Sequence, residues 1–388
     1  MCCRRSSKTP RSRRCPPSAV CGSGPVRLLP GWPHREAAKP IPARPAPGRV
    51  PTTVILIWAT SNRMGVLSST GATGRTAGRQ HVPWISVTLA VVLLIVITPT
   101  TAWAWTPGTH VFLGDAVLGN LSLLPSSLAA LLSAHPADFL YGSIAADTSI
   151  AKKYAEVGRH CHSWHVGLEI HDEADSPALQ AFALGYLAHL AADVVAHNFF
   201  VPRQLAVTSS TTALGHSYWE SRIDTHIGDP WPRRARELLS IDHGRSDQHL
   251  DRILSPTLFG TPTNRRIFRG MVYVTDTESW QRIFQLVSEK SRWDLGDAEV
   301  GRYLARSFDY IIDLFQAWDR SEPFRFDPSG DKPLREAKKV RRLARRQGGD
   351  IRAALEADRM FGMPATPLHH AADLPAPLFT PRVRQVAG

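Results

Sequence analysis

Cysteine is nearly absent from most of this chain. The sequence has 388 residues and five cysteines, of which Cys2, Cys3, Cys15 and Cys21 lie close to the start. Only Cys161 follows, so the rest of the chain cannot contain an internal disulfide. A small fold held together by disulfides is therefore excluded. A protein exported without disulfides must gain its rigidity from its hydrophobic core or from bound metal.

Net charge is also lacking outside the first residues, although the total is +12. Residues 1–81 hold 14 of the 46 basic residues and one of the 34 acidic residues. Residues 82–104 hold no charge, and residues 105–388 hold 32 basic and 33 acidic residues. The basic character is thus confined to the N-terminal part and is no evidence for nucleic-acid binding. Histidine is enriched instead, since 14 of the 16 histidines follow residue 104.

The N-terminal part has the composition of a leader and an export signal. Residues 1–81 are rich in Arg, Pro, Ser and Gly, and we interpret them as a disordered basic leader, with Met64 as an alternative start. The uncharged stretch 82–104 ends in Ala104, a small residue that a signal peptidase favours. We expect cleavage there and export to the periplasm or the medium, which would free the α-amino group of Trp105. The alternative is an uncleaved anchor, because the stretch is just long enough to span a bilayer.

Residues 181–201, AFALGYLAHLAADVVAHNFFV, are typical of one apolar helix interrupted by His189, Asp193 and His197. Each step of four residues turns a helical side chain by only ~40°, so the three share one face. Burying them unpaired would cost several kcal/mol, which bound metal would offset. The two histidines lie ~12 Å apart along the axis, which indicates two ions with Asp193 between them. The alternatives are a core helix with hydrogen-bonded histidines and a membrane span with polar residues.

Other candidate ligands occur before and after this helix. His110 begins an expected helix, and Asp147 is either a ligand or a helix cap. Residues 159–165, RHCHSWH, carry three histidines, a density that favours metal without fixing which histidine binds. His216 and Glu220 lie four residues apart on one expected helix face, which suits zinc or a local hydrogen-bonded pair.

The remaining sequence predicts helices and almost no sheet, because few runs alternate with a period of two. Residues 281–290 and 301–318 have the pattern of amphipathic helices. We expect the domain to cover residues 105–327, followed by a basic helix and a flexible tail over residues 328–388. Residues 331–347 hold eight basic and two acidic residues, which indicates either a solvated helix or contact with an anionic membrane surface.

The candidates occur in a characteristic order: Trp and His at a new N-terminus, Asp, a His cluster, His-x3-Asp with a further His, and His-x3-Glu. This order resembles the bacterial zinc-dependent phospholipase C family and its relatives, the single-strand-specific zinc nucleases, over residues 105–225. The resemblance implies an all-α fold, with up to three zinc ions in a cleft of a single multi-helix domain. It also implies hydrolysis of phosphodiester-type bonds by a metal-activated water. The step of four from Asp193 to His197, where the family has six, indicates a divergent branch.

The resemblance assigns nine residues to three zinc ions. The ligands of the first ion are Asp147, His162, His189 and Asp193, and those of the second are His197, His216 and Glu220. The third ion would be held by Trp105 and His110, and it would share Asp193 with the first. His162 is chosen over His160 and His165 because it follows Asp147 by 15 residues, close to the family spacing. Asp147 and Asp193 are the expected catalytic residues. The first orients or deprotonates the water, and the second bridges two ions.

The leading hypothesis is a phospholipase C that acts on phospholipid head groups outside the cytoplasm. One alternative is a nuclease of the same fold, which would need a basic groove with aromatic platforms. The near-neutral charge of residues 105–388 gives that alternative little support, so nucleic acid is not an expected partner. A second alternative is a zinc-stabilised domain without catalytic activity. The sequence carries no signal for an oligomeric state.

Overall fold

A computed structural model describes residues 105–371, apart from residues 151, 157, 209–211, 229 and 292. The described residues contain no strand, and the predicted all-α fold is confirmed. They belong to one compact unit. The predicted leader and the signal or anchor segment, residues 1–104, lie outside the described residues.

The helical elements of the described residues follow one another in this order: α2 (Pro107–Gly119), η2 (Leu121–Leu123), α3 (Ser126–Ala134), α4 (Pro136–Ala145), η3 (Ala146–Thr148), η4 (Lys152–Tyr154), α5 (Trp164–Asp172), α6 (Pro177–Val195), η5 (Ala196–Phe200), α7 (Val201–Val207), α8 (Thr212–Ile227), α9 (Pro230–Ser240), α10 (Gly244–Ile253), α11 (Thr261–Thr275), α12 (Glu278–Glu289), α13 (Asp297–Ala317), η6 (Trp318–Arg320), η7 (Glu322–Arg325) and α14 (Asp331–Phe361).

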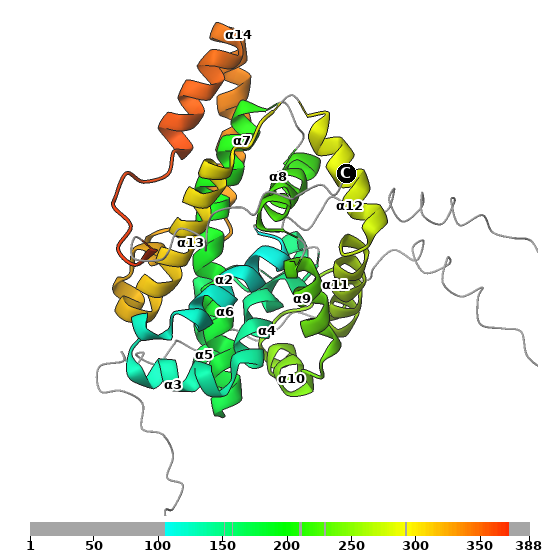
Figure 1. Ribbon diagram of the computed structural model, residues 1–388, viewed down its shortest axis with the longest axis vertical. Helices are drawn as coiled ribbons and strands as arrows, with labels where there is room; N and C mark the ends of the chain where they lie inside the picture. Colours follow the sequence, from blue (N-terminus) through cyan, green and yellow to red (C-terminus); the bar gives the residue numbers. More distant parts are fainter. Residues whose placement is uncertain are drawn as a thin grey trace, which may run out of the picture. The chain divides into compact units, whose positions relative to one another are not determined.

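Helix α6 runs through the centre of these helices, with α4, α5 and α13 packed against it (Figure 1). The hydroxyl of Ser176 caps its first turn, and Pro177 takes the first helical position, where a missing N–H is tolerated. Every residue of α6 from Ala181 onward is buried. The stretch Pro177–Val207 is long and apolar enough to cross a membrane, but 89% of its apolar window is buried inside the molecule. We therefore interpret it as a core helix.

Two glycines set the distance between α4 and α6. A Cβ atom on Gly142 or on Gly185 would lie 2.0 Å from a backbone carbonyl oxygen of the opposite helix. Any larger residue would force the helices apart. The close approach brings the carbonyl oxygen of Ser143 within 2.8 Å of His189 Nδ1. The crossing of α4 and α6 therefore positions a candidate ligand.

The helix predicted over residues 181–201 departs from α-helical geometry near its end. After α6 the chain makes one π-helical turn, η5, before α7 begins. Pro202 is the physical reason, because its ring would clash with the carbonyl group four residues earlier in an unbroken α-helix. His197 lies in this wider turn, whereas His189 and Asp193 lie in α6. That the three residues share one helical face stays a prediction.

Helices predicted elsewhere are present with shifted ends. The helix expected at His110 begins at Pro107, because Thr106 caps it. The helices predicted over 281–290 and 301–318 are α12 and α13. The predicted basic helix is α14, which packs against α7 and η5 and contains a break at Gly349. The predicted domain boundary after residue 327 stays a prediction.

Candidate metal centre

The nine predicted site residues come together in the interior of the helical unit. None is more than 3% exposed. They are supplied by the segment before α2, by α2, η3, the loop before α5, α6, η5 and α8, in chain order: Trp105, His110, Asp147, His162, His189, Asp193, His197, His216 and Glu220. The fold therefore joins residues that span more than a hundred positions of sequence.

Asp193 lies at the middle of a first cluster. Its Oδ1 atom is 3.2 Å from His110 Nε2, and its Oδ2 atom is 2.9 Å from His162 Nε2. The same Oδ2 atom is 3.1 Å from His189 Nε2, and Asp147 Oδ1 is 3.4 Å from His162 Nε2. Ligand atoms within 4.8 Å of one another form two overlapping groups in this cluster. The five side chains have the types and spacing that zinc ligands require.

A second cluster consists of His197, His216 and Glu220, whose ligand atoms also lie within 4.8 Å of one another. The Nε2 atom of His216 is 2.6 Å from Glu220 Oε1, yet neither atom has a hydrogen-bond partner. The two groups are therefore close but not aligned for a hydrogen bond. Convergence of this kind is expected of two side chains that bind the same cation.

Buried polar atoms without hydrogen bonds are concentrated in the two clusters. Among the described residues 14 side-chain atoms are in this condition, and seven belong to predicted ligands. These are His110 Nε2, Asp147 Oδ2, both carboxylate oxygens of Asp193, His197 Nε2, His216 Nε2 and Glu220 Oε1. Such atoms destabilise a fold unless something satisfies them. The residues present therefore fit bound metal ions.

Backbone carbonyl groups orient two of the histidines. The Nδ1 atom of His189 is 2.8 Å from the carbonyl oxygen of Ser143, and that of His197 is 2.6 Å from the carbonyl oxygen of Pro328. A carbonyl oxygen only accepts, so both Nδ1 atoms carry the hydrogen. Each Nε2 atom then presents a lone pair to its cluster, which is the usual arrangement behind a metal-binding imidazole.

The electrostatics of the clusters keep three of the histidine ligands unprotonated. Burial lowers the pKa of His110 and of His197 to about 4, and holds the pKa of His216 well below its usual range. Burial works in the opposite direction on Asp193, but the neighbouring histidines hold its pKa well below its ordinary value. Burial and the nearby carboxylates raise the pKa of Glu220 well above its ordinary value. The second cluster therefore lacks a positive group of its own.

Lys152 is a member of the first cluster that sequence reasoning missed. It is buried, and its Nζ atom lies 3.0 Å from Asp147 Oδ1 and 3.1 Å from His162 Nε2. Burial alone would lower its pKa, but Asp147 keeps that pKa above its ordinary value. The ammonium group therefore offsets part of the carboxylate charge. Nothing in the sequence AKKY distinguishes this lysine from its neighbour, so only the fold reveals it.

The structure separates the three histidines of residues 159–165. Only His162 points its imidazole at both aspartates of the first cluster. His160 is half-buried, and its Nδ1 atom accepts the backbone N–H of His162. His165 is exposed. This placement agrees with the choice of His162 from its spacing.

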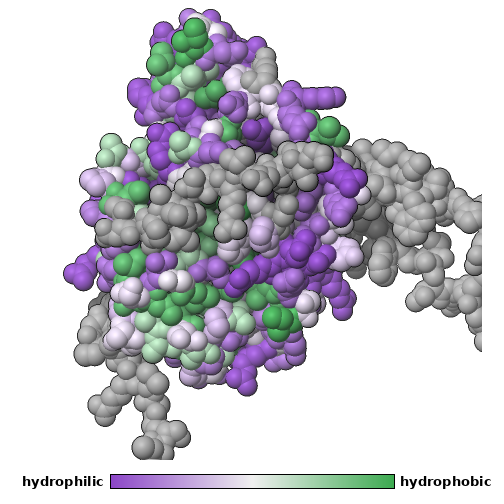
Figure 2. Space-filling model, in the orientation of Figure 1, coloured by the Kyte–Doolittle hydropathy of each residue, from purple (hydrophilic) through white to green (hydrophobic). Residues whose placement is uncertain are grey.

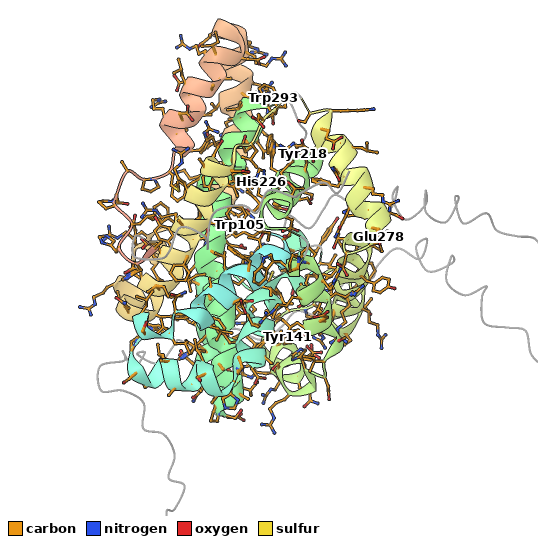
Figure 3. All side chains as sticks on the ribbon, viewed as in Figure 1. Trp105, Tyr141, Tyr218, His226, Glu278 and Trp293 are labelled. Carbon is orange, nitrogen blue, oxygen red and sulfur yellow. The ribbon has the colours of Figure 1, made fainter. Side chains whose placement is uncertain are left out.

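Trp105 lies beside the first cluster without contacting a ligand through its ring. Its indole N–H donates to the carbonyl oxygen of Ala192 at 3.0 Å, and the ring stacks on Phe200 with 5.3 Å between centroids. Figure 3 shows Trp105 among the central helices. The indole of Trp105 thus contacts the residue that precedes Asp193 in α6.

Two hollows on the surface do not coincide with the clusters. One is lined by residues of α9, and the other lies between the start of α6 and α10. Neither is lined by a predicted ligand. The chemistry of the clustered side chains, and not the size of a hollow, identifies the candidate site.

Comparison with protein families identifies the segment that carries these clusters. Residues 109–256 match the family model described as zinc dependent phospholipase C. Residues 109–256 are therefore a zinc-dependent phospholipase C segment. The matched segment contains all the predicted ligands except Trp105. A comparison with curated proteins gave no match, and neither did a comparison with solved structures. The match of this segment implies hydrolase activity, and the clusters suggest zinc binding.

Proposed function

We propose that this protein is a phospholipase C that hydrolyses the phosphodiester bond of phospholipid head groups. The observation that carries the proposal is the pair of buried ligand clusters inside the segment that matches the family. A structural zinc site usually closes on four protein ligands, whereas clusters that share a region and leave several ligand atoms unpaired resemble a multi-metal catalytic centre.

The ligands divide into the sets expected from the family. Asp147, His162, His189 and Asp193 would hold one zinc ion, and the second cluster would hold another. His110 lies close enough to Asp193 to share a third ion across that carboxylate. When bound, zinc lowers the pKa of water and stabilises negative charge that develops on phosphoryl oxygens.

The chain's own residues would contribute in three ways. Asp147 offers a second oxygen, Oδ2, that is free of hydrogen bonds, so it can accept a proton from the attacking water. Lys152 sits on the other oxygen of Asp147 and keeps this carboxyl ionised. The hydrogen bonds of His189 and His197 to backbone carbonyls keep both imidazoles in the tautomer that binds metal.

We also propose that the protein is exported and cleaved after Ala104. Support comes from the uncharged run of residues 82–104 and from the burial of Trp105 next to the first cluster. A free α-amino group at Trp105 would add a nitrogen ligand to the third ion. N-terminal sequencing of the protein recovered outside the cytoplasm tests this, and an intact N-terminal segment would contradict it.

The test of the function combines zinc content with a substrate panel. Purified protein, supplied with zinc, is assayed on phosphatidylcholine and on single-stranded DNA and RNA. Release of phosphocholine that depends on zinc and disappears in Asp193→Asn is the expected result. The control is Asp175→Asn, which removes an exposed carboxylate away from the clusters. Cleavage of nucleic acid alone would indicate the nuclease alternative, and zinc without any turnover would indicate a non-catalytic domain.

A further inference from the structure

Helix α14 exposes aliphatic side chains that its packing does not explain. Its inner face consists of buried side chains that contact the helical unit: Ala337, Val340 and Ala344 before the break, and Ala353, Ala357 and Phe361 after it. On other faces Leu343 is 57% exposed, Ile351 79% and Leu355 65%. Folding gives no reason for large aliphatic groups in water, and such groups on a helix commonly mark an interaction site.

The exposed aliphatic groups after the break lie on one face. Ile351 and Leu355 are one helical turn apart, and the buried residues of this half, Ala353 and Ala357, are two residues out of step with them. Because a helix has ~3.6 residues per turn, that offset places the two pairs on roughly opposite faces. The two aliphatic side chains therefore point away from the rest of the protein.

Basic residues without acidic partners occupy the outer face before the break. Arg342, Arg345 and Arg346 are exposed, and no ion pair joins them to the described residues. They are spaced three and four residues apart, opposite Val340 and Ala344. The whole helix carries ten basic and five acidic residues, although residues 105–388 are nearly neutral. The excess positive charge is thus local to α14.

The helix break lies between the two kinds of side chain. Gly349 has φ 73° and ψ −154°, a backbone conformation outside the helical region, and it separates the arginines from Ile351 by a few residues. Figure 2 shows hydrophobic side chains at the upper tip of the view, where Figure 1 places α14, with hydrophilic ones around them. Exposed aliphatic and basic side chains therefore occur together on the outer faces of α14.

We propose that this surface, Arg342, Leu343, Arg345, Arg346, Ile351 and Leu355, docks on an anionic lipid bilayer. Aliphatic groups that enter the headgroup region and cations that remain at the phosphate level are the combination by which interfacial helices bind membranes. A protein partner with an acidic groove is less favoured. Such a groove has a fixed shape, whereas single exposed aliphatic side chains and unpaired arginines can each find a place on a fluid lipid surface. Membrane docking itself does not depend on the proposed phospholipase function. Only its role does, since docking would bring the metal centre to a phospholipid substrate.

The start of α14 is fixed directly to the second cluster. A Cβ atom on Gly330 would lie 2.4 Å from His197 Cβ and 2.5 Å from the His197 carbonyl oxygen. The carbonyl oxygen of Pro328 accepts from His197 Nδ1, and that of Asp327 accepts from Asn198 at 2.9 Å. The start of the docking helix therefore contacts a candidate ligand directly. A bilayer that holds α14 would also hold the metal centre at a set distance from the lipid.

The test is vesicle binding by the full chain and by matched variants. Vesicles contain phosphatidylcholine alone or with about one third phosphatidylserine. One variant combines Arg342→Gln, Arg345→Gln and Arg346→Gln. Its affinity for the anionic vesicles should fall on the order of 100-fold, because each basic residue raises the affinity for such a surface about fivefold. Ile351→Ser with Leu355→Ser should weaken it by tenfold or more, about equally on both vesicles.

Two controls remove the same charge and the same apolar area elsewhere. Arg233→Gln, Arg266→Gln and Arg282→Gln alter exposed arginines of other helices, and Ile241→Ser with Leu258→Ser alter exposed aliphatic residues. The controls should bind like the unchanged protein. Amide hydrogen exchange supplies a local readout, which the basic residues of the first 81 positions do not affect. Residues 342–360 should gain protection with anionic vesicles.

The outcomes separate this proposal from the proposed function. If the α14 variants lose vesicle binding but cleave a water-soluble phosphodiester at the normal rate, docking and catalysis are independent, as expected. If the protein binds through α14 yet cleaves no phospholipid, the proposed function fails and the docking surface stands. Equal binding by all variants, or no protection at residues 342–360, would overturn the docking proposal.

Discussion

The two clusters of the metal centre differ in how their charge is balanced. The first cluster contains two ionised aspartates, and Lys152 supplies a cation from within the protein. The second cluster contains two neutral histidines and Glu220, whose raised pKa reflects burial beside other carboxylates. The first cluster is therefore partly satisfied by the fold alone. The second depends on a cation from outside to ionise its carboxyl group.

The clusters also differ in what holds them. The first cluster rests on α6 and α2 and on the close crossing of α4 with α6. The second rests on η5 and α8, and one of its histidines is oriented by the loop before α14. Residues 257–371 lie outside the segment that matches the family, yet they contribute that loop. The family segment therefore builds the first cluster by itself but not the full support of the second.

The largest expected effect separates the clusters by their metal content. Asp193→Asn removes a carboxylate that contacts three histidines, so zinc should be lost from the first cluster and hydrolysis should fall by about 10³-fold or more, since a metal contributes several kcal/mol to such reactions. Glu220→Gln should reduce zinc by about one ion and leave the first cluster loaded. Elemental analysis of zinc beside the assay gives both results. Equal zinc in both variants and in the unchanged protein would refute the division into two clusters.

Lys152→Met tests the internal cation. Without added zinc, the variant should lose about 3 kcal/mol of unfolding free energy or more, because a buried carboxylate loses its partner. Saturating zinc should reduce that loss, because a bound cation takes over the compensation of Asp147. Denaturant unfolding with and without zinc measures both values. Lys290→Met, on the surface, should change neither, and a loss that zinc does not reduce would show that Lys152 has another role.

The sequence predicted which side chains come together better than it predicted their arrangement. Asp193 was indicated because a polar residue on an apolar helix needs a partner, and His216 was indicated because it lies four residues before Glu220. The division into two clusters was expected from the length of the helix, but the π-helical turn at His197 was not. That turn depends on how Pro202 is accommodated, and the sequence alone did not show whether the helix would bend, break or widen.

Lys152 and the loop before α14 were beyond sequence reasoning for a different reason. Their roles arise from contacts between distant segments, such as His197 with Pro328, 131 positions apart. No period or spacing encodes such a contact. The all-α fold, in contrast, follows from local patterns that each helix carries within its own residues.

A smaller effect is expected where α14 meets the second cluster. Gly330→Ala places a methyl group against the backbone of His197 at a position with φ 59°, so it should cost about 2–4 kcal/mol and lower zinc in the second cluster only. Gly349→Ala is the matched control. Its φ is 73° and nothing lies within 4 Å, so it should cost about 1–3 kcal/mol through backbone strain alone and leave zinc unchanged. Equal zinc in the two variants would show that the loop does not support the cluster.

The smallest effect concerns Asp224, which connects the two clusters. It lies on α8 with the second cluster, but it accepts hydrogen bonds from Thr106 and Thr109 at the start of the helix that carries His110. Burial raises its pKa to about 6, although the two hydroxyl groups act to lower it. The folded state thus holds this proton more tightly than the unfolded chain, so Asp224 adds stability below pH ~4 and loses it as pH rises through about 6.

Asp224→Asn should remove that dependence while keeping an acceptor for both hydroxyl groups. Relative to the variant, the unchanged protein should lose on the order of 1 kcal/mol between pH 4 and pH 7, a value reduced by the partial exposure of the side chain. Thermal unfolding of both proteins across this range, under metal-free conditions, gives the comparison. Parallel curves would mean that Asp224 is already ionised at low pH. The contact between α8 and α2 would then be an ordinary charged hydrogen bond. The free energy of unfolding that it contributes would not change with pH over this range.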